Sequence, residues 1–289
     1  MRFLRPRSWE QALQDRAENP GALPVAGGTD VMVEVNFDRS RPAALLDLTA
    51  VPELAEWSQS RGSLRIGAGV PYGRLVAELG DRLPGLALAA RTVGSPQIRN
   101  RGTLGGNLGS ASPAGDALPP LLAGGAEVEL ASVRGSRAVP VEQFCTGPKR
   151  TVLAPDELIA AVRVAPATGP EQFSKIGPRN AMVIAVCAFA VALRPEQRQV
   201  RTGLGAAGPT PLRAPAAEEL VAAELDWDGA GPLPDGLARR FGGLVAEAAN
   251  PIDDVRGTAD YRRHALGVLA RRTLTWVWDE YRGRRPECA

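Results

Sequence analysis

The sequence predicts a mixed fold, α/β in its first part and α+β in its last third. As far as residue 164, short apolar strands alternate with helical segments, which is typical of an α/β domain. After the proline- and glycine-containing segment 166–170, two apolar runs are followed by three helical segments, which is typical of an α+β domain. We therefore expect two domains, at residues 1–168 and 169–289, with the first divided into subdomains at about 1–57 and 58–168.

Composition places the chain among ordinary globular proteins. It has 289 residues, of which 44% are hydrophobic and 23% are charged, with a formal net charge of +2. A nucleic-acid-binding protein usually has a concentrated basic stripe, so this charge argues against one. No apolar stretch is long enough and sufficiently free of charge to cross a bilayer, and the N-terminus lacks the apolar core of a signal peptide. We expect a cytoplasmic protein without a transmembrane segment.

The cysteines are few and widely spaced. Cys145, Cys187 and Cys288 form neither a metal-binding pattern nor a disulfide framework, which favours a reducing compartment. Three thiolates cannot provide the four ligands of an iron–sulfur cluster. We therefore predict no metal site in this chain, and Cys187, which lies in an apolar run, is expected to pack in the core.

The first elements follow from capping residues and apolar spacing. Ser8 and Gln11 form a capping-box pattern before a helix that Asn19-Pro20-Gly21 ends. A short strand, 22–25, precedes a glycine pair, and periodicity leaves 30–35 undecided between a helical turn and an extended segment. The sequence next predicts a buried strand at 45–48, a short helix at 52–57, a strand at 63–70, a helix from Pro71 to Gly80 and a helix at 86–93.

The later elements are read in the same way. A helical turn or two is predicted at 116–122, and alternation predicts strands at 126–131 and 158–164. Beyond the linker, the apolar runs 182–193 and 200–206 predict strands of a small sheet. Helices are then predicted at 216–224, 237–249 and 261–278.

Two glycine-rich segments are the most informative motifs. They are Val25-Ala26-Gly27-Gly28-Thr29-Asp30 and Thr103-Leu104-Gly105-Gly106-Asn107-Leu108. Glycine allows positive φ angles and close approach of a ligand to the main chain, and exposed amides in such turns suit a phosphate. One segment alone most often forms only a turn, but two in one chain predict a pair of adjacent phosphates, as in a dinucleotide.

The common nucleotide motifs are excluded by spacing. The chain has no Gly-x-x-x-x-Gly-Lys-Ser/Thr, and neither glycine segment has the Gly-x-Gly-x-x-Gly spacing of a Rossmann fold. Asp116, shortly after the second segment, is placed to accept hydrogen bonds from ribose hydroxyls or from an adenine amine. It could equally cap the helix that follows, and the two roles are compatible.

Several ordered motifs resemble one family. Gln97-Ile98-Arg99-Asn100, Thr103-Leu104-Gly105-Gly106-Asn107, Ser112-Pro113 and Asp116 resemble the FAD-binding subunit of molybdenum hydroxylases, of the carbon monoxide dehydrogenase and xanthine dehydrogenase type. The upstream segment 26–30 resembles the family's other FAD-binding turn. The segments 173–181 and 260–272 resemble parts of its C-terminal domain, so the resemblance covers nearly the whole chain.

The resemblance implies a two-subdomain FAD-binding domain of the PCMH type, followed by a smaller domain with a short antiparallel sheet and helices. It implies FAD, bound non-covalently, with its pyrophosphate against both glycine segments. The phosphate contacts would be Pro24, Val25, Ala26, Gly27, Gly28, Thr29, Asp30, Thr103, Leu104, Gly105, Gly106 and Asn107.

The resemblance also assigns three further cofactor-binding residues. Asp116 would lie at the ribose or adenine end of FAD. Lys175 matches a lysine that approaches the flavin ring, where a cation stabilises the anionic reduced form; its alternative is a solvated surface lysine. Ile159 aligns with a residue that packs near the flavin. Some relatives have a histidine at the position where this chain has Thr29.

By this resemblance the chain is an FAD-dependent oxidoreductase subunit that transfers electrons and has no catalytic residues of its own. Molybdopterin would reside in a large partner subunit and [2Fe-2S] clusters in a small one, in a dimer of heterotrimers. The acceptor would be NAD, dioxygen or another molecule. Two alternatives stay open: a stand-alone flavin oxidase of the same fold, and a flavin-free assembly scaffold. The lone His264 lies far from both glycine segments in sequence, which disfavours covalent flavin.

Overall fold

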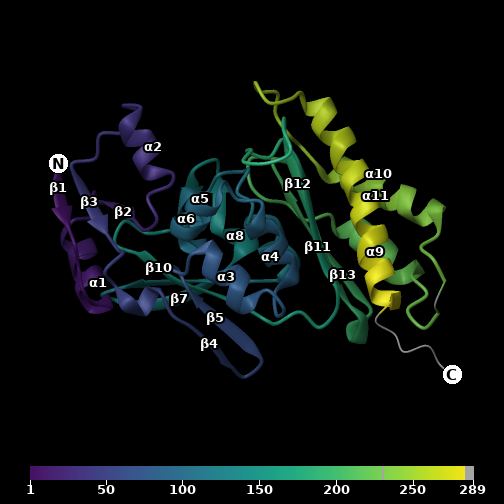
Figure 1. Ribbon diagram of the computed structural model, residues 1–289, viewed down its shortest axis with the longest axis horizontal. Coiled ribbons are helices and arrows are strands. Elements are labelled where there is room, and N and C mark those ends of the chain that lie inside the picture. Colours follow the sequence, from purple (N-terminus) through teal and green to yellow (C-terminus); the bar gives the residue numbers. More distant parts are fainter. Residues whose placement is uncertain (230, 284–289) are drawn as a thin grey trace.

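The computed structural model describes residues 1–229 and 231–283. Along the longest axis, the N-terminal strands lie at one end and the long C-terminal helices at the other (Figure 1). The strands form sheets of three, five, three and two strands. Mixed α/β structure is thus followed by a small antiparallel sheet with helices, and the predicted fold class is confirmed.

The N-terminal region is a parallel sheet of order β1-β3-β2 with flanking helices. It contains β1 (Arg2–Leu4), α1 (Trp9–Glu18), β2 (Leu23–Val25), α2 (Val31–Asn36) and β3 (Ala44–Asp47). The hydroxyl of Ser8 caps α1 by accepting from the amide of Gln11 at 3.2 Å. This is the cap that the sequence predicts, because a side-chain oxygen must satisfy an otherwise free amide at a helix start.

The middle region is built on an antiparallel sheet of order β4-β5-β10-β6-β7. Its strands are β4 (Trp57–Ser60), β5 (Ser63–Gly67), β6 (Glu127–Ser132), β7 (Gly135–Pro140) and β10 (Leu158–Val164), beside the small hairpin β8 (Cys145–Gly147) and β9 (Arg150–Thr151). Its helices are α3 (Tyr72–Leu79), α4 (Pro84–Arg91), α5 (Pro96–Arg101), α6 (Leu104–Ser110), α7 (Leu118–Gly124) and α8 (Val141–Phe144).

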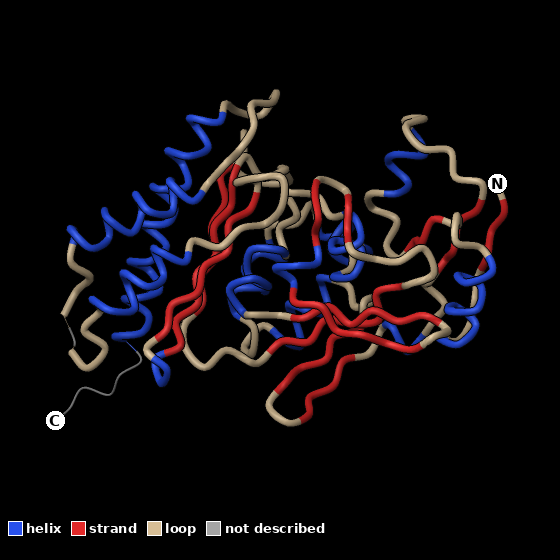
Figure 2. Tube along the Cα trace, turned by 180° about the vertical axis from the view of Figure 1, so that it is seen from behind, coloured by secondary structure: helices blue, strands red, loops and turns tan. Residues whose placement is uncertain are grey.

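The C-terminal region is a three-stranded antiparallel sheet covered by helices. It contains β11 (Glu171–Ile176), β12 (Cys187–Arg194), β13 (Gln199–Gly205), α9 (Pro215–Glu224), α10 (Asp235–Ala248) and α11 (Ala259–Gly283). Figure 2 shows these helices on the outer face of the sheet, with the middle region on the other side.

The central strand β12 explains why both faces of this sheet are buried. Successive side chains of a strand point to opposite faces. The large residues Phe189, Val191 and Leu193 belong to the core shared with the outer helices, whereas Ala188, Ala190 and Ala192 pack with Ala89, Ala123 and Phe173. The small face lets α4 and α7 approach closely. At Gly203 of β13 a Cβ would lie 2.0 Å from the carbonyl oxygen of Pro119, so only glycine fits there.

Several boundaries differ from those that the sequence predicts. The undecided segment 30–35 is mostly helical, because α2 spans Val31–Asn36. The predicted short helix 52–57 is a 3₁₀ turn, Pro52–Leu54, and Trp57 already begins β4. The apolar run 182–193 becomes a strand only from Cys187, because residues 182–186 lie in the loop between β11 and β12.

In the described residues, no helix has the length and apolar character needed to cross a membrane.

Glu171 joins the middle and C-terminal regions. Its Oε2 accepts from the amide of Gly85, at the start of α4, at 3.1 Å. Burial raises the pKa of Glu171 to about 7, although the Gly85 amide and the charge of Arg194 act in the opposite direction. A cavity of about 630 Å³ beside it is also lined by Asp81, Arg91 and Glu280.

We predict that Glu171→Gln stabilises the protein above neutral pH. The folded-state pKa is raised, so the folded chain binds the proton more tightly than the unfolded chain, and stability is lost as pH rises from about 4.5 to 7. Glutamine keeps an acceptor for Gly85 without the charge. Urea unfolding should give the variant and the wild type nearly equal free energies of unfolding at pH 5. At pH 8 the variant's free energy of unfolding should be higher by on the order of 2 kcal/mol. Glu219→Gln, at an exposed position of α9, is the control; an equal gain there would contradict the prediction.

Candidate functional site

The two glycine segments meet in space. A Cβ on Gly27 would lie 1.9 Å from the carbonyl oxygen of Arg101, so the first turn lies directly against the residues that lead into the second segment. The Ser110 hydroxyl, at the end of α6, donates to Oδ2 of Asp30 at 2.7 Å. Segments whose glycine pairs are 78 positions apart (Gly27 and Gly28 against Gly105 and Gly106) thus lie side by side at one site.

The first segment is an open turn between β2 and α2. Gly28 has a φ of +74°, which a residue with a side chain rarely adopts. Within the described part of the chain, the amides of residues 26–30 make no hydrogen bond. Successive free amides in a turn with positive φ form a concavity that attracts anions.

The second segment is not a loop but the first turn of α6. Thr103 caps this helix by accepting from the amide of Gly106 at 3.0 Å. The Gly105 amide donates to the Ala68 carbonyl at 2.9 Å, and the Asn107 amide donates to the Thr103 carbonyl at 3.1 Å. These amides therefore already have partners, and the expectation that both segments present free amides holds only for the first.

The two glycines of the second segment differ in surroundings. A Cβ on Gly105 would lie 2.5 Å from the Ala68 Cβ, so this glycine allows α6 to pack on the chain after β5. A Cβ on Gly106 would meet only the Thr103 hydroxyl, at 3.1 Å. Gly106 is thus the one of the pair whose Cβ would meet no backbone of another segment within 4 Å.

Lys175 and Asp116, both predicted as cofactor contacts, bond to each other. The Lys175 ammonium lies 2.7 Å from Oδ2 of Asp116, and both side chains are nearly buried. The ammonium also donates to the carbonyls of Thr92 at 3.0 Å and Val183 at 3.2 Å. Lys175 is therefore not a solvated surface lysine. It links β11 to the middle region.

Asp116 retains one free oxygen. Burial raises the pKa of this carboxyl, while the charge and hydrogen bond of Lys175 lower it. The alternative role as a helix cap is not adopted, because α7 begins after Ala117 without a side-chain cap. Oδ1 of Asp116 is buried and makes no hydrogen bond, so it is the free oxygen of this carboxyl.

Three buried side-chain oxygens lack a partner in residues 1–229 and 231–283, and all three lie at this site. They are Tyr72 Oη, Asn107 Oδ1 and Asp116 Oδ1. Asn107 is beside Gly115, where a Cβ would lie 3.0 Å from its Oδ1. Buried polar atoms are nearly always satisfied, so a cluster of unsatisfied ones indicates a place where a polar ligand binds.

The sequence reasoning missed Tyr72. It follows Pro71 at the start of α3, just beyond the end of β5. Its position at the end of a strand and the start of a helix was the available signal, since ligand-contacting side chains often lie at such junctions.

Ile159 is buried on β10, where its Cδ1 would lie 3.7 Å from a Cβ on Gly109 of α6. It therefore supports the helix that bears the second glycine segment. Cys187 is fully buried, as expected, and burial raises the pKa of the thiols of Cys145 and Cys187 to about 11 and about 12. Cys288 lies outside the described residues.

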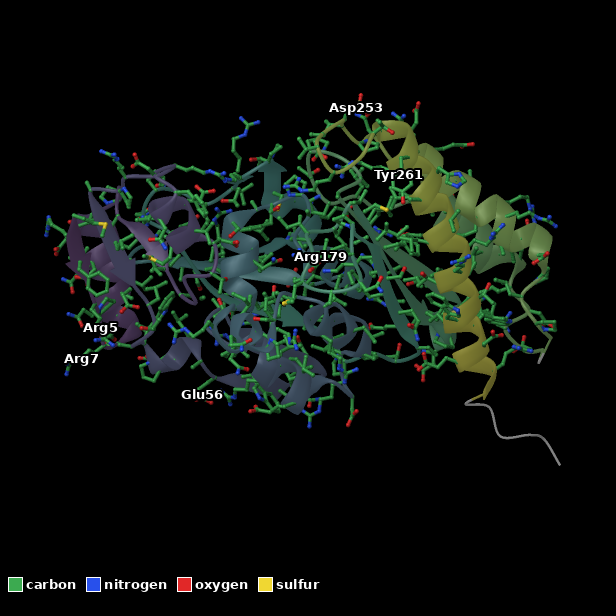
Figure 3. All side chains as sticks on the ribbon, turned by 45° about the horizontal axis from the view of Figure 1, so that its top comes forward. Arg5, Arg7, Glu56, Arg179, Asp253 and Tyr261 are labelled. Carbon is green, nitrogen blue, oxygen red and sulfur yellow. The ribbon has the colours of Figure 1, made fainter. Side chains whose placement is uncertain are left out.

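The remaining features that could form a site lie away from the two glycine segments. A cavity of about 450 Å³ is lined by Arg5, Arg7 and residues 49–52, near the end of the molecule where Figure 3 labels Arg5 and Arg7. Among the described residues, no cluster of three or more potential metal-ligating side chains occurs. His264 is exposed on α11, in the C-terminal region.

A turn with free amides beside buried, unsatisfied oxygens is typical of a protein that binds an anionic nucleotide cofactor. Comparison with known proteins gives its family. Residues 1–167 match the FAD binding domain in molybdopterin dehydrogenase, and residues 172–277 match the CO dehydrogenase flavoprotein C-terminal domain.

Individual proteins are similar to most of the chain. The putative xanthine dehydrogenase FAD-binding subunit of Escherichia coli K12 is 29% identical, with 94% of each chain covered. Caffeine dehydrogenase subunit beta of a Pseudomonas species is 33% identical over 76% of this chain and 77% of its own. The solved structure of carbon monoxide dehydrogenase from Hydrogenophaga pseudoflava matches with a TM-score of 0.89 and 27% identity, covering 97% of this chain and 98% of that one.

The chain therefore belongs to the family of FAD-binding subunits of molybdopterin dehydrogenases. It is a subunit of an oxidoreductase, and its cofactor is FAD. The unsatisfied buried oxygens can accept from the hydroxyl groups of FAD, and the free amides of the first turn can donate to its phosphates. The residues present therefore fit this cofactor.

We predict that Lys175→Met lowers the free energy of unfolding by about 3 kcal/mol, because it leaves the buried Asp116 carboxylate without its cation. The double variant Lys175→Met/Asp116→Asn should recover part of this loss, since no charge then remains buried. Urea unfolding of the wild type, the two single variants and the double variant measures the coupling free energy between Lys175 and Asp116. If the losses of the two single variants simply add up in the double variant, the prediction is wrong.

We also predict that Gly105→Ala destabilises the fold by about 2 kcal/mol, because the new Cβ cannot be placed without moving α6 away from Ala68. Gly243→Ala is the matched control. No atom would lie within 4 Å of its Cβ, and alanine favours the interior of α10. Chemical denaturation compares the two. Equal stabilities would show that α6 does not pack as described.

Proposed function

We propose that this chain is the FAD-carrying electron-transfer subunit of a molybdenum hydroxylase complex. In this proposal, molybdopterin resides in a large partner subunit and [2Fe-2S] clusters reside in a small one, in a dimer of heterotrimers in the cytoplasm. Bound FAD supplies the redox chemistry, receiving electrons from the clusters and passing them to NAD, dioxygen or another acceptor.

The protein's own residues bind and position the cofactor. The amides of the first turn would hold the diphosphate, and the open side of Gly106 would let the cofactor approach α6. The free oxygens of Asp116 and Asn107 would accept from its hydroxyl groups. The proposed contacts are Pro24, Val25, Ala26, Gly27, Gly28, Thr29, Asp30, Thr103, Leu104, Gly105, Gly106, Asn107, Asp116, Ile159 and Lys175.

Lys175 has a different task in this proposal from that of a free cation. Its three acceptors hold the ammonium in place, so it orients Asp116 at the site and keeps that carboxylate, its charged partner, fixed.

The observation that supports the proposal most strongly is the grouping of the three buried side-chain oxygens that lack a partner in the described part of the chain. The number of cysteines supports the placement of the clusters in a partner. A cluster takes four thiolate ligands, and the chain has three cysteines.

We predict that Gly106→Val abolishes FAD binding while the chain still folds, because the new side chain fills the open side of α6 without meeting buried backbone. The full chain is reconstituted with FAD, and released flavin fluorescence is measured after denaturation. Flavin should separate from the polypeptide, as for a non-covalent cofactor. Gly243→Val is the matched control and should retain FAD.

Two results would oppose the proposal. If the wild-type chain takes up no FAD, a flavin-free scaffold is favoured instead. If denatured protein keeps its flavin, the cofactor is covalently attached, as in some stand-alone oxidases of this fold.

A further inference from the structure

Tyr72 has a buried hydroxyl that no described residue satisfies. The residue is 3% exposed, and its hydroxyl oxygen makes no hydrogen bond. Leaving a buried hydroxyl unpaired is costly, and phenylalanine would provide the same ring without that cost. A tyrosine kept at such a position indicates that its hydroxyl has a partner outside the chain.

Tyr72 is fixed beside the second glycine segment. Its amide donates to the Gly102 carbonyl at 3.0 Å, and Pro71 pairs with Thr103 in an isolated bridge. A Cβ on Gly102 would lie 3.6 Å from Cδ2 of the Tyr72 ring. The ring therefore lies against the residues that lead into α6.

The surrounding charges make Tyr72 a donor. Burial, together with the carboxylates of Asp116 and Asp30, raises the pKa of Tyr72 well above its usual value, so the phenol stays neutral and keeps its proton. The other two unsatisfied oxygens are the amide oxygen of Asn107 and a carboxylate oxygen of Asp116. Both can accept hydrogen bonds, and neither can donate one. A ligand that satisfies this cluster must therefore offer at least one acceptor as well as donors.

Two cations near the site are already engaged. Lys175 has three acceptors, and the Arg99 guanidinium donates to the carbonyls of Val93 at 3.1 Å and Gly94 at 3.0 Å. Neither of these two is free for a ligand oxygen beside α3, where the Tyr72 hydroxyl offers a neutral donor.

We propose that Tyr72 is a cofactor-binding residue whose hydroxyl donates a hydrogen bond to an oxygen of bound FAD, in the diphosphate–ribitol stretch that joins the flavin ring to adenosine. This inference rests on the proposed function. It adds to it a contact that lies outside both glycine segments, on a helix that neither motif includes.

The test compares Tyr72→Phe with the wild type and with Tyr261→Phe, in the full chain. Tyr261 is half exposed on α11 in the C-terminal region, where Figure 3 labels it, so its substitution removes a hydroxyl remote from the site. Two quantities are measured for each protein: the dissociation constant for FAD, from quenching of flavin fluorescence, and the thermal midpoint without and with FAD.

Tyr72→Phe should bind FAD about tenfold more weakly, as expected for loss of one hydrogen bond to a polar or charged oxygen. Its midpoint without FAD should equal or exceed that of the wild type, because an unsatisfied buried hydroxyl has been removed. Its rise in midpoint on adding FAD should be smaller. A purely structural tyrosine would not give this combination, since its loss would lower the midpoint of the free chain as well.

An unchanged FAD affinity in Tyr72→Phe, with normal binding by the wild type, would overturn this inference and leave the proposed function in place. A lower midpoint for the FAD-free variant together with weaker binding would also overturn it, because the residue would then act through the fold. If the wild type itself fails to bind FAD, the proposed function fails first. A tenfold loss in Tyr261→Phe would show that the effect is not specific to the site.

Discussion

The buried pairing of Lys175 with Asp116 is the interaction on which the arrangement of this molecule depends. A charge removed from water must be matched by an opposite charge and hydrogen-bond partners. Lys175 finds its partners in Asp116, in Thr92 after α4 and in Val183 in the loop before β12. The same ammonium thus determines how the C-terminal sheet meets the middle region and how one wall of the cofactor site is oriented.

Local patterns predicted most of the elements, because their causes are local. The cap of α1 at Ser8, the start of α3 after Pro71, the alternation in β10 and the apolar run that contains β12 all follow from a few neighbouring residues. The alternation of alanine with large residues in β12 carries more information than a strand assignment. It specifies one face for helix packing through large side chains and one for close approach of a second domain.

The details of the site required contacts between distant segments. Nothing near Asp116 in the sequence indicates that its partner is Lys175, and the second glycine pair reads as a loop although it starts a helix. That helix forms because Ala68 and Thr103 accept the amides of Gly105 and Gly106. Tyr72 was missed for the same reason: its role depends on Gly102, Asp30 and Asp116, none of which is close to it in sequence.

The tight contact between Gly27 and the Arg101 carbonyl has a consequence for how such motifs are read across a family. Close packing requires glycine at Gly27 and Gly105 whether or not a cofactor is bound, so a descendant that lost its flavin would still retain both. A Cβ on Gly106 would meet only the Thr103 hydroxyl, and selection at that position would relax once the cofactor was gone. Substitution of Gly106, rather than loss of Gly27 or Gly105, would therefore distinguish a relative that no longer binds flavin from one that does.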